Sequence, residues 1–354
     1  MNRHVVIVAA GTGGHVMPGL ALADEMRARG WTVSWIGTRR GMEKDLVQQH
    51  GIALDLLDFS GLRGKGVMGA LLGGFKLLQA MWQCVRILRL RRPAVVFGTG
   101  GYVCIPAGMM ASLLGKKLVL LNADAAWLMS NRFLRSLADR IAFGFSGKDA
   151  AAGVYTGNPV RAEVAQVPVP AERFADRSGP LKVLVIGGSL GAMVLNETIP
   201  RALALMAPDQ RPQVIHQTGQ RHLDSVRAAY AEQGQTAEVV PFIDDMASAY
   251  SSADLVICRA GAITVSELCA AGVASVLVPL RISTTAHQVH NAEWLAQQGA
   301  CLHLPQAELT PARMAELLRS LDRPRLLHMA ERARLQSRPQ AAQAVADLIE
   351  EVCP

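Results

Sequence analysis

The sequence has 354 residues, of which 50% are hydrophobic and 18% charged, and its formal net charge is +7. This length and hydrophobic content exclude a disordered chain and predict two domains with separate cores. The six cysteines form neither Cys-x-x-Cys pairs nor zinc-binding spacings with histidine, so we expect reduced thiols in the cytoplasm and no metal site.

The amino-terminal half alternates apolar strands with helical segments, as a doubly wound parallel sheet does. Strands are expected at residues 5–10, 32–37, 95–98, 118–121 and 141–145, and helices near 20–29, 42–50, 67–92 and 130–137. The uncharged run 93–115 is long enough to raise the question of a membrane span. Its glycines and Pro106 would leave backbone groups unpaired in lipid, so a strand, a glycine loop and a helix explain it better.

Two nearly identical glycine loops follow strands of this half, GTGGH at 11–15 and GTGGY at 98–102. Such loops present backbone N–H groups beside the positive end of a helix, which suits phosphate, although glycine also serves simply to tighten a turn. His15 stands where the first loop becomes a helix, a position that favours a neutral imidazole able to act as a general base. The alternative is a histidine that only hydrogen-bonds its own loop.

The interval between Asp58 and Asp124 contains no acidic residue but many lysines and arginines, which implies a partner that bears phosphate. Aromatic residues are few and nucleic-acid-binding motifs are lacking, so an anionic membrane surface fits better than nucleic acid. Core packing remains an open alternative for the helix at 67–92 as a whole. The residues expected to touch lipid are Arg63, Lys65, Val67, Met68, Leu71, Leu72 and Phe75.

After a linker expected near residues 160–180, the alternation restarts. Strands are expected at 183–188, 213–219, 238–243, 254–261 and 275–279, with helices at 196–206, 223–233, from 264 onward, and at 341–352. The loops at 11–16 and 187–192 each lack one glycine of the dinucleotide fingerprint, which disfavours NAD.

Two segments of the second half carry candidate binding residues. Thr264 and Glu267 have the spacing of a capping box, yet a carboxylate at this strand-to-helix turn also suits the two hydroxyls of a ribose. In that case Ser266 and the backbone of 262–266 face a diphosphate. The polar cluster at 287–291 suits sugar hydroxyls better than a metal, because no carboxylate accompanies its histidines; a solvated loop is the alternative.

Seven motifs in a fixed order give the chain a resemblance to a known family along essentially its whole length. They are GTGGHVMPGLALA (11–23), GLRGKG (61–66), GTGGY (98–102), TGNPVR (156–161), GGSLGA (187–192), FIDDM (242–246) and CRAGAITVSELCAAG (258–272). Together they closely resemble the MurG family, the UDP-N-acetylglucosamine transferases that complete the lipid-linked disaccharide of peptidoglycan. The resemblance implies an α/β protein of the GT-B fold, with two Rossmann-like, doubly wound parallel-sheet domains facing a central cleft.

The resemblance also implies how the domains divide the reaction. Residues 1–162, completed by the helix within 340–354, would bind the lipid I acceptor and the membrane, and residues 163–339 would bind UDP-N-acetylglucosamine. The implied reaction is an inverting, metal-independent transfer of N-acetylglucosamine to the C4 hydroxyl of lipid I, without a cofactor, which gives lipid II. The implied location is peripheral, on the cytoplasmic face of the inner membrane, with cell-wall and division proteins as further partners and no nucleic acid.

Two other functions are compatible with the same fold and the same sequence motifs. One is an isomerase similar to the UDP-N-acetylglucosamine 2-epimerases, which would need no lipid acceptor. The other is a non-catalytic family member that binds the membrane or division proteins.

Carried over by resemblance, the donor-contacting positions are Thr12, Gly13, Gly14, Asp124, Arg161, Ser189, Ile243, Ala262, Ile263, Thr264, Val265, Ser266, Glu267 and Gln288. We expect Ile243 to end a strand and to pair with uracil through its backbone, and Glu267 to hold the ribose. Arg161 and Ser189 would bind the diphosphate, and Gln288 the sugar hydroxyls. The second glycine loop, with Gly100, Gly101 and Tyr102, is assigned to the diphosphate of the acceptor.

One stretch departs from the family pattern. Where the family has His-Glu-Gln-Asn, this chain has Leu121-Asn122-Ala123-Asp124. A carboxylate at position 124 would repel a diphosphate unless it faces the sugar or takes up a proton. The departure also removes a rival histidine, so His15 is the residue we expect to act as the base.

Overall fold

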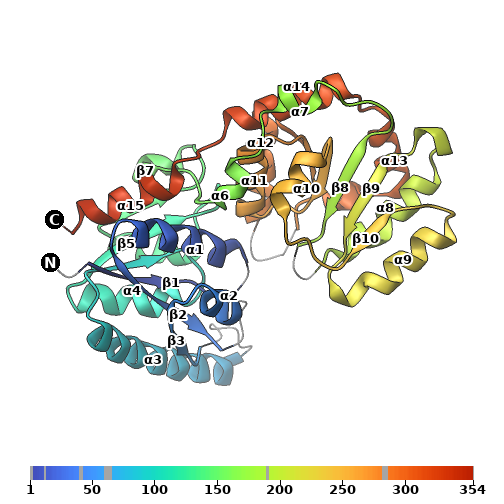
Figure 1. The fold of residues 1–354 in the computed structure, drawn as a ribbon. Helices are drawn as coiled ribbons and strands as arrows, with labels where there is room; N and C mark the ends of the chain where they lie inside the picture. Colours follow the sequence, from blue (N-terminus) through green and yellow to red (C-terminus); the bar gives the residue numbers. More distant parts are fainter. Residues whose placement is uncertain are drawn as a thin grey trace. The chain divides into compact units, whose positions relative to one another are not determined.

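The computed structural model describes residues 3–11, 13–39, 43–59, 66–188, 191–280 and 286–353, with the backbone alone at 66–72. The chain forms two compact units, one made of residues 1–160 and 338–354 and the other of residues 161–337. Each unit is built on one parallel sheet, so the predicted α/β fold with two doubly wound sheets is confirmed (Figure 1). The division falls slightly before the expected boundaries, and Arg161 therefore belongs to the second unit.

The first unit has a seven-stranded sheet in the order β3-β2-β1-β4-β5-β6-β7. Its strands are β1 (His4–Val8), β2 (Thr32–Thr38), β3 (Ala53–Leu57), β4 (Val95–Gly98), β5 (Lys117–Asn122), β6 (Arg140–Phe143) and β7 (Val154–Tyr155). Its α-helices are α1 (Gly13–Ala28), α2 (Glu43–Gln49), α3 (Gly66–Arg91), α4 (Cys104–Leu113), α5 (Met129–Leu134) and α15 (Ala341–Glu351).

These helices cover both faces of the sheet. Helix α4 packs against α3 and α5 on one face, whereas α15 packs on α1 at the other (Figure 1). Polar contacts fix α15 there, since Arg29 on the turn after α1 pairs with Asp347 at 2.6 Å and with Glu350 at 2.8 Å. Trp31 donates from Nε1 to Glu350 over 3.0 Å. The last helix of the chain thus completes the first unit.

Three elements of the first unit differ from the prediction, and one of them is the two-residue edge strand β7, which was not expected. β3 was not expected, because Asp55 interrupts its short apolar run and the strand lies half-buried at the sheet edge. Helix α1 begins at Gly13 rather than near Leu20, so Pro18 lies inside the helix and His15 in its first turn.

The second unit has a six-stranded sheet in the order β10-β9-β8-β11-β12-β13. Its strands are β8 (Lys182–Ile186), β9 (Gln213–Gln217), β10 (Glu238–Val240), β11 (Leu255–Cys258), β12 (Ser275–Leu277) and β13 (Cys301–His303). Its α-helices are α6 (Ala162–Ala165), α7 (Pro170–Phe174), α8 (Met193–Ala204), α9 (Leu223–Glu232), α10 (Met246–Ser252), α11 (Ala262–Ala271), α12 (His287–Gln297), α13 (Pro311–Arg319) and α14 (Arg323–Leu335).

One expectation for the second unit is wrong, and so are two alternatives that the sequence left open. β10 ends at Val240, so Ile243 lies in the following loop rather than at a strand end. Helix α11 begins at Ala262 with Gly261 as its N-cap, so Thr264 is inside the helix and forms no capping box. The polar cluster at 287–291 lies in the first turns of α12 rather than in a solvated loop.

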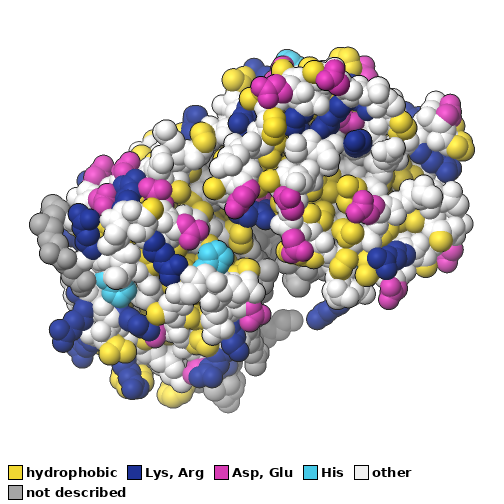
Figure 2. All heavy atoms as spheres, viewed as in Figure 1, with side chains coloured by type: hydrophobic (Ala, Val, Ile, Leu, Met, Phe, Trp, Pro, Cys, Tyr) yellow, Lys and Arg dark blue, Asp and Glu magenta, His cyan; other side chains and the backbone are white. Residues whose placement is uncertain are grey.

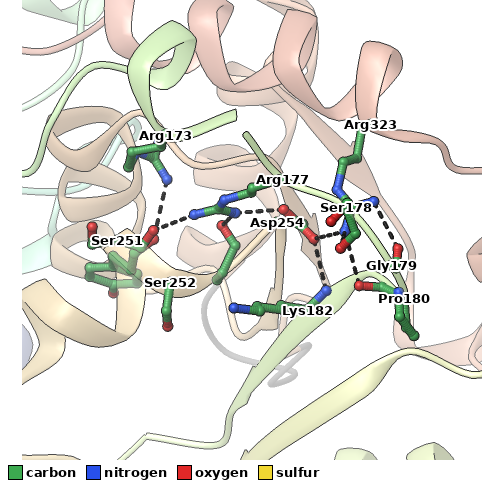
Figure 3. A network of polar contacts seen from close by, with 12 residues as sticks. Arg173, Arg177, Ser178, Gly179, Pro180, Lys182, Ser251, Ser252, Asp254 and Arg323 are labelled. Carbon is green, nitrogen blue, oxygen red and sulfur yellow. Dashed lines mark hydrogen bonds and ion pairs between the residues drawn. The ribbon is translucent and has the colours of Figure 1, made fainter. Parts of the chain in front are cut away.

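A buried arginine, Arg173, ties the linker to two helices, and Figure 3 shows it beside Ser251 of the first of them, α10. Arg173 of α7 donates to the carbonyls of Tyr250, Ala271 and Gly272, which lie near the carboxyl ends of α10 and α11. Burial lowers the pKa of Arg173 to about 10, so the guanidinium stays charged at neutral pH and these hydrogen bonds are charge-assisted. The contacts fix α10 and α11, and α11 carries the candidate residues 262–267.

A second group of contacts in the same view centres on the fully buried Asp254, just before β11 (Figure 3). Its carboxylate pairs with Arg177 at 2.5 Å and with Arg323 at 3.3 Å. It also accepts from the backbone N–H of Lys182 over 2.8 Å. The linker, the start of α14 and the central strands β8 and β11 are therefore held by one carboxylate.

Candidate active site

The two glycine loops of the first unit meet at His15, because β1 and β4 are neighbouring strands. His15 donates from Nδ1 to the carbonyl oxygen of Thr99 over 3.0 Å. A carbonyl only accepts, so Nδ1 carries the proton, and in the neutral ring the basic lone pair lies on Nε2. The first loop therefore supplies a candidate base, and the second loop sets its tautomer.

The second loop also packs against the ring of His15. Gly100 and Gly101 have φ angles of +97° and +85°, a region that favours glycine. A β-carbon at Gly100 would lie 3.4 Å from Cε1 of His15 and 2.5 Å from a methyl group of Leu128. Tyr102 turns its ring toward Phe59, with the ring centroids 5.7 Å apart. Both glycines are thus needed for the turn, and Gly100 also because Leu128 leaves no room for a β-carbon, whereas the distances to His15 are ordinary van der Waals contacts.

A residue that the sequence analysis missed, Glu43 of α2, holds the first loop. Its fully buried carboxylate accepts from the backbone N–H of Gly11 over 3.1 Å. The other oxygen accepts from the N–H and the hydroxyl of Thr38, over 2.7 and 2.8 Å. An acid in the first turn of a helix is ordinary, so the sequence carried no signal that linked Glu43 to the loop.

The stretch that departs from the family pattern forms a turn at the end of β5, organised by the buried Asn122. Its amide donates to the carbonyls of Asp124 and Ala126 over 2.9 and 3.1 Å, and its Oδ1 accepts from the N–H of Leu128 over 2.8 Å. The half-buried Asp124 lies within this turn. Asn158 of the TGNPVR motif donates to the carbonyl of Ala123 over 2.9 Å, which brings that motif to the same edge of the sheet.

In the second unit, Arg161 and Glu267 form an ion pair. Nε and Nη2 of Arg161 lie 2.9 and 2.8 Å from Oε1 of Glu267. The hydroxyl of Tyr250, which the sequence analysis missed, donates to the other carboxylate oxygen over 3.2 Å. Burial raises the pKa of Glu267, and the nearby Arg161 and Tyr250 offset part of that rise. The residues expected to contact diphosphate and ribose therefore contact each other.

The first turn of α11 carries the backbone N–H groups that the sequence analysis assigned to a diphosphate. Its N-cap, Gly261, makes no side-chain capping bond. The hydroxyl of Ser266 donates to the carbonyl of Ala262 over 2.9 Å, so it points along its own helix. Ala262, Ile263 and Val265 are buried, and Thr264 is half-buried. Any contact of this turn with an anion would therefore be made by the backbone.

Two further donor candidates, Ile243 and Gln288, lie before and after α11 in the sequence. Gln288, in the first turn of α12, accepts at Oε1 from the backbone N–H of Leu280 over 2.9 Å, and Asn291 of the same helix donates to the carbonyl of Ala260 over 3.0 Å. The half-buried Ile243 lies two residues before Asp245, the N-cap of α10.

Several candidates lie outside the described residues. These are Thr12, Ser189, Arg63 and Lys65, together with the side chains of Val67, Met68, Leu71 and Leu72. Gly13 and Gly14, which follow Thr12, form the start of α1.

The face of α3 exposes large apolar side chains beside basic ones. Phe75, Leu78 and Trp82 are 69%, 65% and 63% exposed. The guanidinium of Arg86 lies 6.0 Å from the ring centroid of Trp82. Figure 2 shows hydrophobic and basic side chains mixed along the edge of the first unit where α3 lies. No helix in the described part of the chain has the length and apolar character needed to cross a bilayer.

The described residues contain no group of three or more His, Cys, Asp or Glu side chains able to hold a metal ion.

Comparison with known families matches both halves of the chain. Residues 5–143 match the glycosyltransferase family 28 N-terminal domain, and residues 182–352 match the C-terminal domain of the same family. Two similar proteins, from Methylibium petroleiphilum and Herminiimonas arsenicoxydans, are 62% and 55% identical, and the matches cover 99% of this chain and 97% and 99% of theirs. Both are named UDP-N-acetylglucosamine–N-acetylmuramyl-(pentapeptide) pyrophosphoryl-undecaprenol N-acetylglucosamine transferase.

Among solved structures, MurG of Acinetobacter baumannii superposes with a TM-score of 0.84 at 38% identity, and the match covers 99% of both chains. A putative UDP-N-acetylglucosamine 2-epimerase from Listeria monocytogenes superposes with a TM-score of 0.64 at 14% identity, covering 99% of this chain and 96% of its own. At that identity the second likeness concerns the fold alone.

Proposed function

The chain belongs to glycosyltransferase family 28, and from this premise we propose how its residues carry out the reaction that its relatives' name states. In this reaction N-acetylglucosamine passes from UDP-N-acetylglucosamine to the undecaprenyl-linked N-acetylmuramyl acceptor, lipid I, which gives lipid II. We infer that the C4 hydroxyl of the muramoyl sugar is the acceptor group. The acceptor oxygen attacks the anomeric carbon, the bond to the diphosphate breaks, and UDP leaves. The hydroxyl must lose its proton, and the diphosphate gains negative charge.

In our proposal His15 removes the proton. The observation that carries this assignment is the hydrogen bond from Nδ1 to Thr99, which leaves the basic lone pair on Nε2 of the neutral ring. The glycines against which the ring packs, Gly100 and Gly101, would bind the acceptor diphosphate through their backbone together with Tyr102. The first unit is then the acceptor-binding unit.

The second unit would bind the donor. Backbone N–H groups of the first turn of α11, with Arg161 and Ser189, would stabilise the departing diphosphate. Glu267 would accept hydrogen bonds from the ribose hydroxyls, Ile243 would pair with uracil, and Gln288 would bind the sugar. Thr12, Gly13 and Gly14, which belong to the first unit, are further donor contacts proposed from the family resemblance. Asp124 would face the sugar, because a carboxylate is repelled by the diphosphate.

We assign membrane contact to α3. Its exposed Phe75, Leu78 and Trp82 would enter the headgroup region of an anionic bilayer, with Arg86 and the basic segment 61–66 on its phosphates. With this assignment, the protein would act as a peripheral enzyme on the cytoplasmic face of the membrane that carries its lipid substrate. Cell-wall and division proteins are the further partners proposed.

Labelled UDP-N-acetylglucosamine tests the activity when it is incubated with the protein in the presence and absence of a lipid I analogue. We expect labelled disaccharide only when the acceptor is present. An epimerised donor sugar, formed without acceptor, would indicate an isomerase instead. No product in either mixture, with donor binding intact, would indicate a non-catalytic protein.

A further inference from the structure

Arg161 and Tyr250 are the two described side chains that contact the Glu267 carboxylate. Of these, Tyr250 has no role in the proposed reaction. Its ring is almost fully buried, with 1% of its surface exposed. Its hydroxyl donates to Oε2 of Glu267 over 3.2 Å, whereas Arg161 occupies Oε1. The two oxygens of the carboxylate therefore have different partners, one on each side.

These partners differ in how readily they can move. The Arg161 side chain is 30% exposed and lies over a carboxylate that is only 7% exposed. Tyr250 is in the core, and its backbone carbonyl accepts from the buried Arg173 over 3.3 Å. In the proposed donor complex, a diphosphate would draw the partly exposed arginine away and uncover Oε1, whereas the buried tyrosine would stay in place.

The carboxylate would then need a second support. Without Arg161, a buried Glu267 has lost its ionic partner, and the remaining hydrogen bond from Tyr250 both stabilises its charge and limits its rotation. Helix α10, which carries Tyr250, follows directly after the loop of Ile243, the proposed uracil contact. The same short helix thus connects Ile243, the proposed uracil contact, to Glu267, the proposed ribose contact.

We propose that Tyr250 is a positioning residue for the ribose of the donor. Its hydroxyl holds Oε2 of Glu267, so that Oε1 faces the ribose hydroxyls when Arg161 has turned to the diphosphate. Tyr250 does not touch the donor and acts only through Glu267. This inference rests on the proposed donor site and adds the group that orients its carboxylate.

The test compares Tyr250→Phe with the wild type for binding of two donors, UDP-N-acetylglucosamine and its 2′,3′-dideoxyuridine analogue. The phenylalanine keeps the buried ring and removes only the hydroxyl. We expect the variant to bind UDP-N-acetylglucosamine about tenfold more weakly by calorimetry, because a hydrogen bond to a charged group is lost. We expect wild type and variant to bind the dideoxy analogue equally, because it has no hydroxyls for Glu267 to accept.

Tyr230→Phe is the matched control. Tyr230 is another buried tyrosine of the same unit, 2% exposed, and its hydroxyl contacts Nδ1 of His216 at 3.0 Å. Loss of the Tyr230 hydroxyl should leave the affinity for both donors unchanged. If Tyr250→Phe weakened the binding of both donors equally, the effect would reflect a general loss of structure, and the proposed role of Tyr250 would be wrong.

A third variant, Glu267→Gln, separates this inference from the donor site on which it rests. Weaker UDP-N-acetylglucosamine binding in Glu267→Gln with unchanged binding in Tyr250→Phe would overturn the role of Tyr250 alone. Unchanged binding in Glu267→Gln would remove the ribose contact itself, and the role of Tyr250 with it. Wild-type melting temperatures in both variants would exclude misfolding as the cause.

Discussion

Single side chains in this protein are held by contacts that decide their chemistry. The carbonyl of Thr99 sets the tautomer of His15, and a buried tyrosine and a half-buried arginine contact different oxygens of Glu267. Each of these groups has a chemical state that its position in the sequence does not determine. The first two predictions concern such groups.

Replacing His15 with alanine should lower turnover by about a hundredfold or more, the usual loss when a general base is removed. The affinity for UDP-N-acetylglucosamine should change little, because the base acts on the acceptor hydroxyl. His50→Ala is the control, since His50 is exposed and its ring also contacts a backbone carbonyl, that of Leu46 at 2.8 Å. Steady-state kinetics measure turnover and the dependence on donor concentration for both variants. Unchanged turnover in His15→Ala would rule out His15 as the base.

His216 should make the second unit sensitive to acid. It is fully buried, and burial lowers its pKa from 6.5 to about 4. The folded protein therefore resists a proton that the unfolded chain accepts, so the stabilising effect is complete above pH 6.5 and is lost as the pH falls toward 4. The full shift corresponds to about 3 kcal/mol of unfolding free energy.

In His216→Gln the amide can still contact Tyr230 and Asn196 but does not titrate. Urea unfolding at pH 7 and pH 4 should show a smaller loss of stability in this variant than in the wild type. Groups common to both proteins cancel in the comparison. Equal losses in the two proteins would mean that His216 does not control the acid sensitivity.

Residue types in short motifs predicted much of the proposed site, because glycine loops, a histidine and a carboxylate at strand ends have recognisable chemistry. Glu43 and Tyr250 could not be found this way. Each acts through a partner that the fold brings close, Gly11 for one and Glu267 for the other. A lone acid or tyrosine in a helix carries no sign of such a partner.

At the scale of elements, apolar periodicity predicted the central strands correctly and predicted edges and polar helices poorly. β3 was missed because an edge strand is only half-buried and can contain Asp55. The first turns of α12 were read as a possible loop because polar residues fill them. Pro18 hid the true start of α1. In each case tertiary packing outweighs the local pattern.

The buried Asp254 joins several elements, which leads to a prediction at this scale. Asp254→Asn should lower the unfolding free energy of the second unit by about 3–5 kcal/mol, because Arg177 and Arg323 lose their shared ionic partner in a buried place. Asp347→Asn removes a surface pair with Arg29 in the first unit and should cost less than about 1 kcal/mol. Calorimetry checks both values, and similar losses in the two variants would contradict the prediction.

At the scale of the whole molecule, each unit has its own sheet and its own buried core. Length and hydrophobic content sufficed to predict this division. The same composition does not reveal which apolar residues of a helix stay outside, since the periodicity of α3 fits core packing as well as lipid contact. The exposure of Phe75, Leu78 and Trp82 supplies that information.

Replacing both Phe75 and Trp82 with glutamate should reduce binding to anionic vesicles about tenfold or more, because two large apolar side chains would no longer enter the bilayer. Turnover with a water-soluble lipid I analogue should be retained. Leu205→Glu is the control, since Leu205 is 53% exposed but lies in the second unit. Vesicle sedimentation measures the binding, and wild-type binding of the double variant would place membrane contact elsewhere.

The packing of α15 on α1 has a consequence for the order in which the protein is made. The ribosome completes the continuous second unit, residues 161–337, before it adds α15. Until then Trp31 and Arg29 lack their partners on α15, and the surface of α1 on which α15 packs remains open to water. The unit that is translated first must therefore finish folding last, and a nascent chain stalled within the second unit would expose an unfinished first unit to chaperones and proteases.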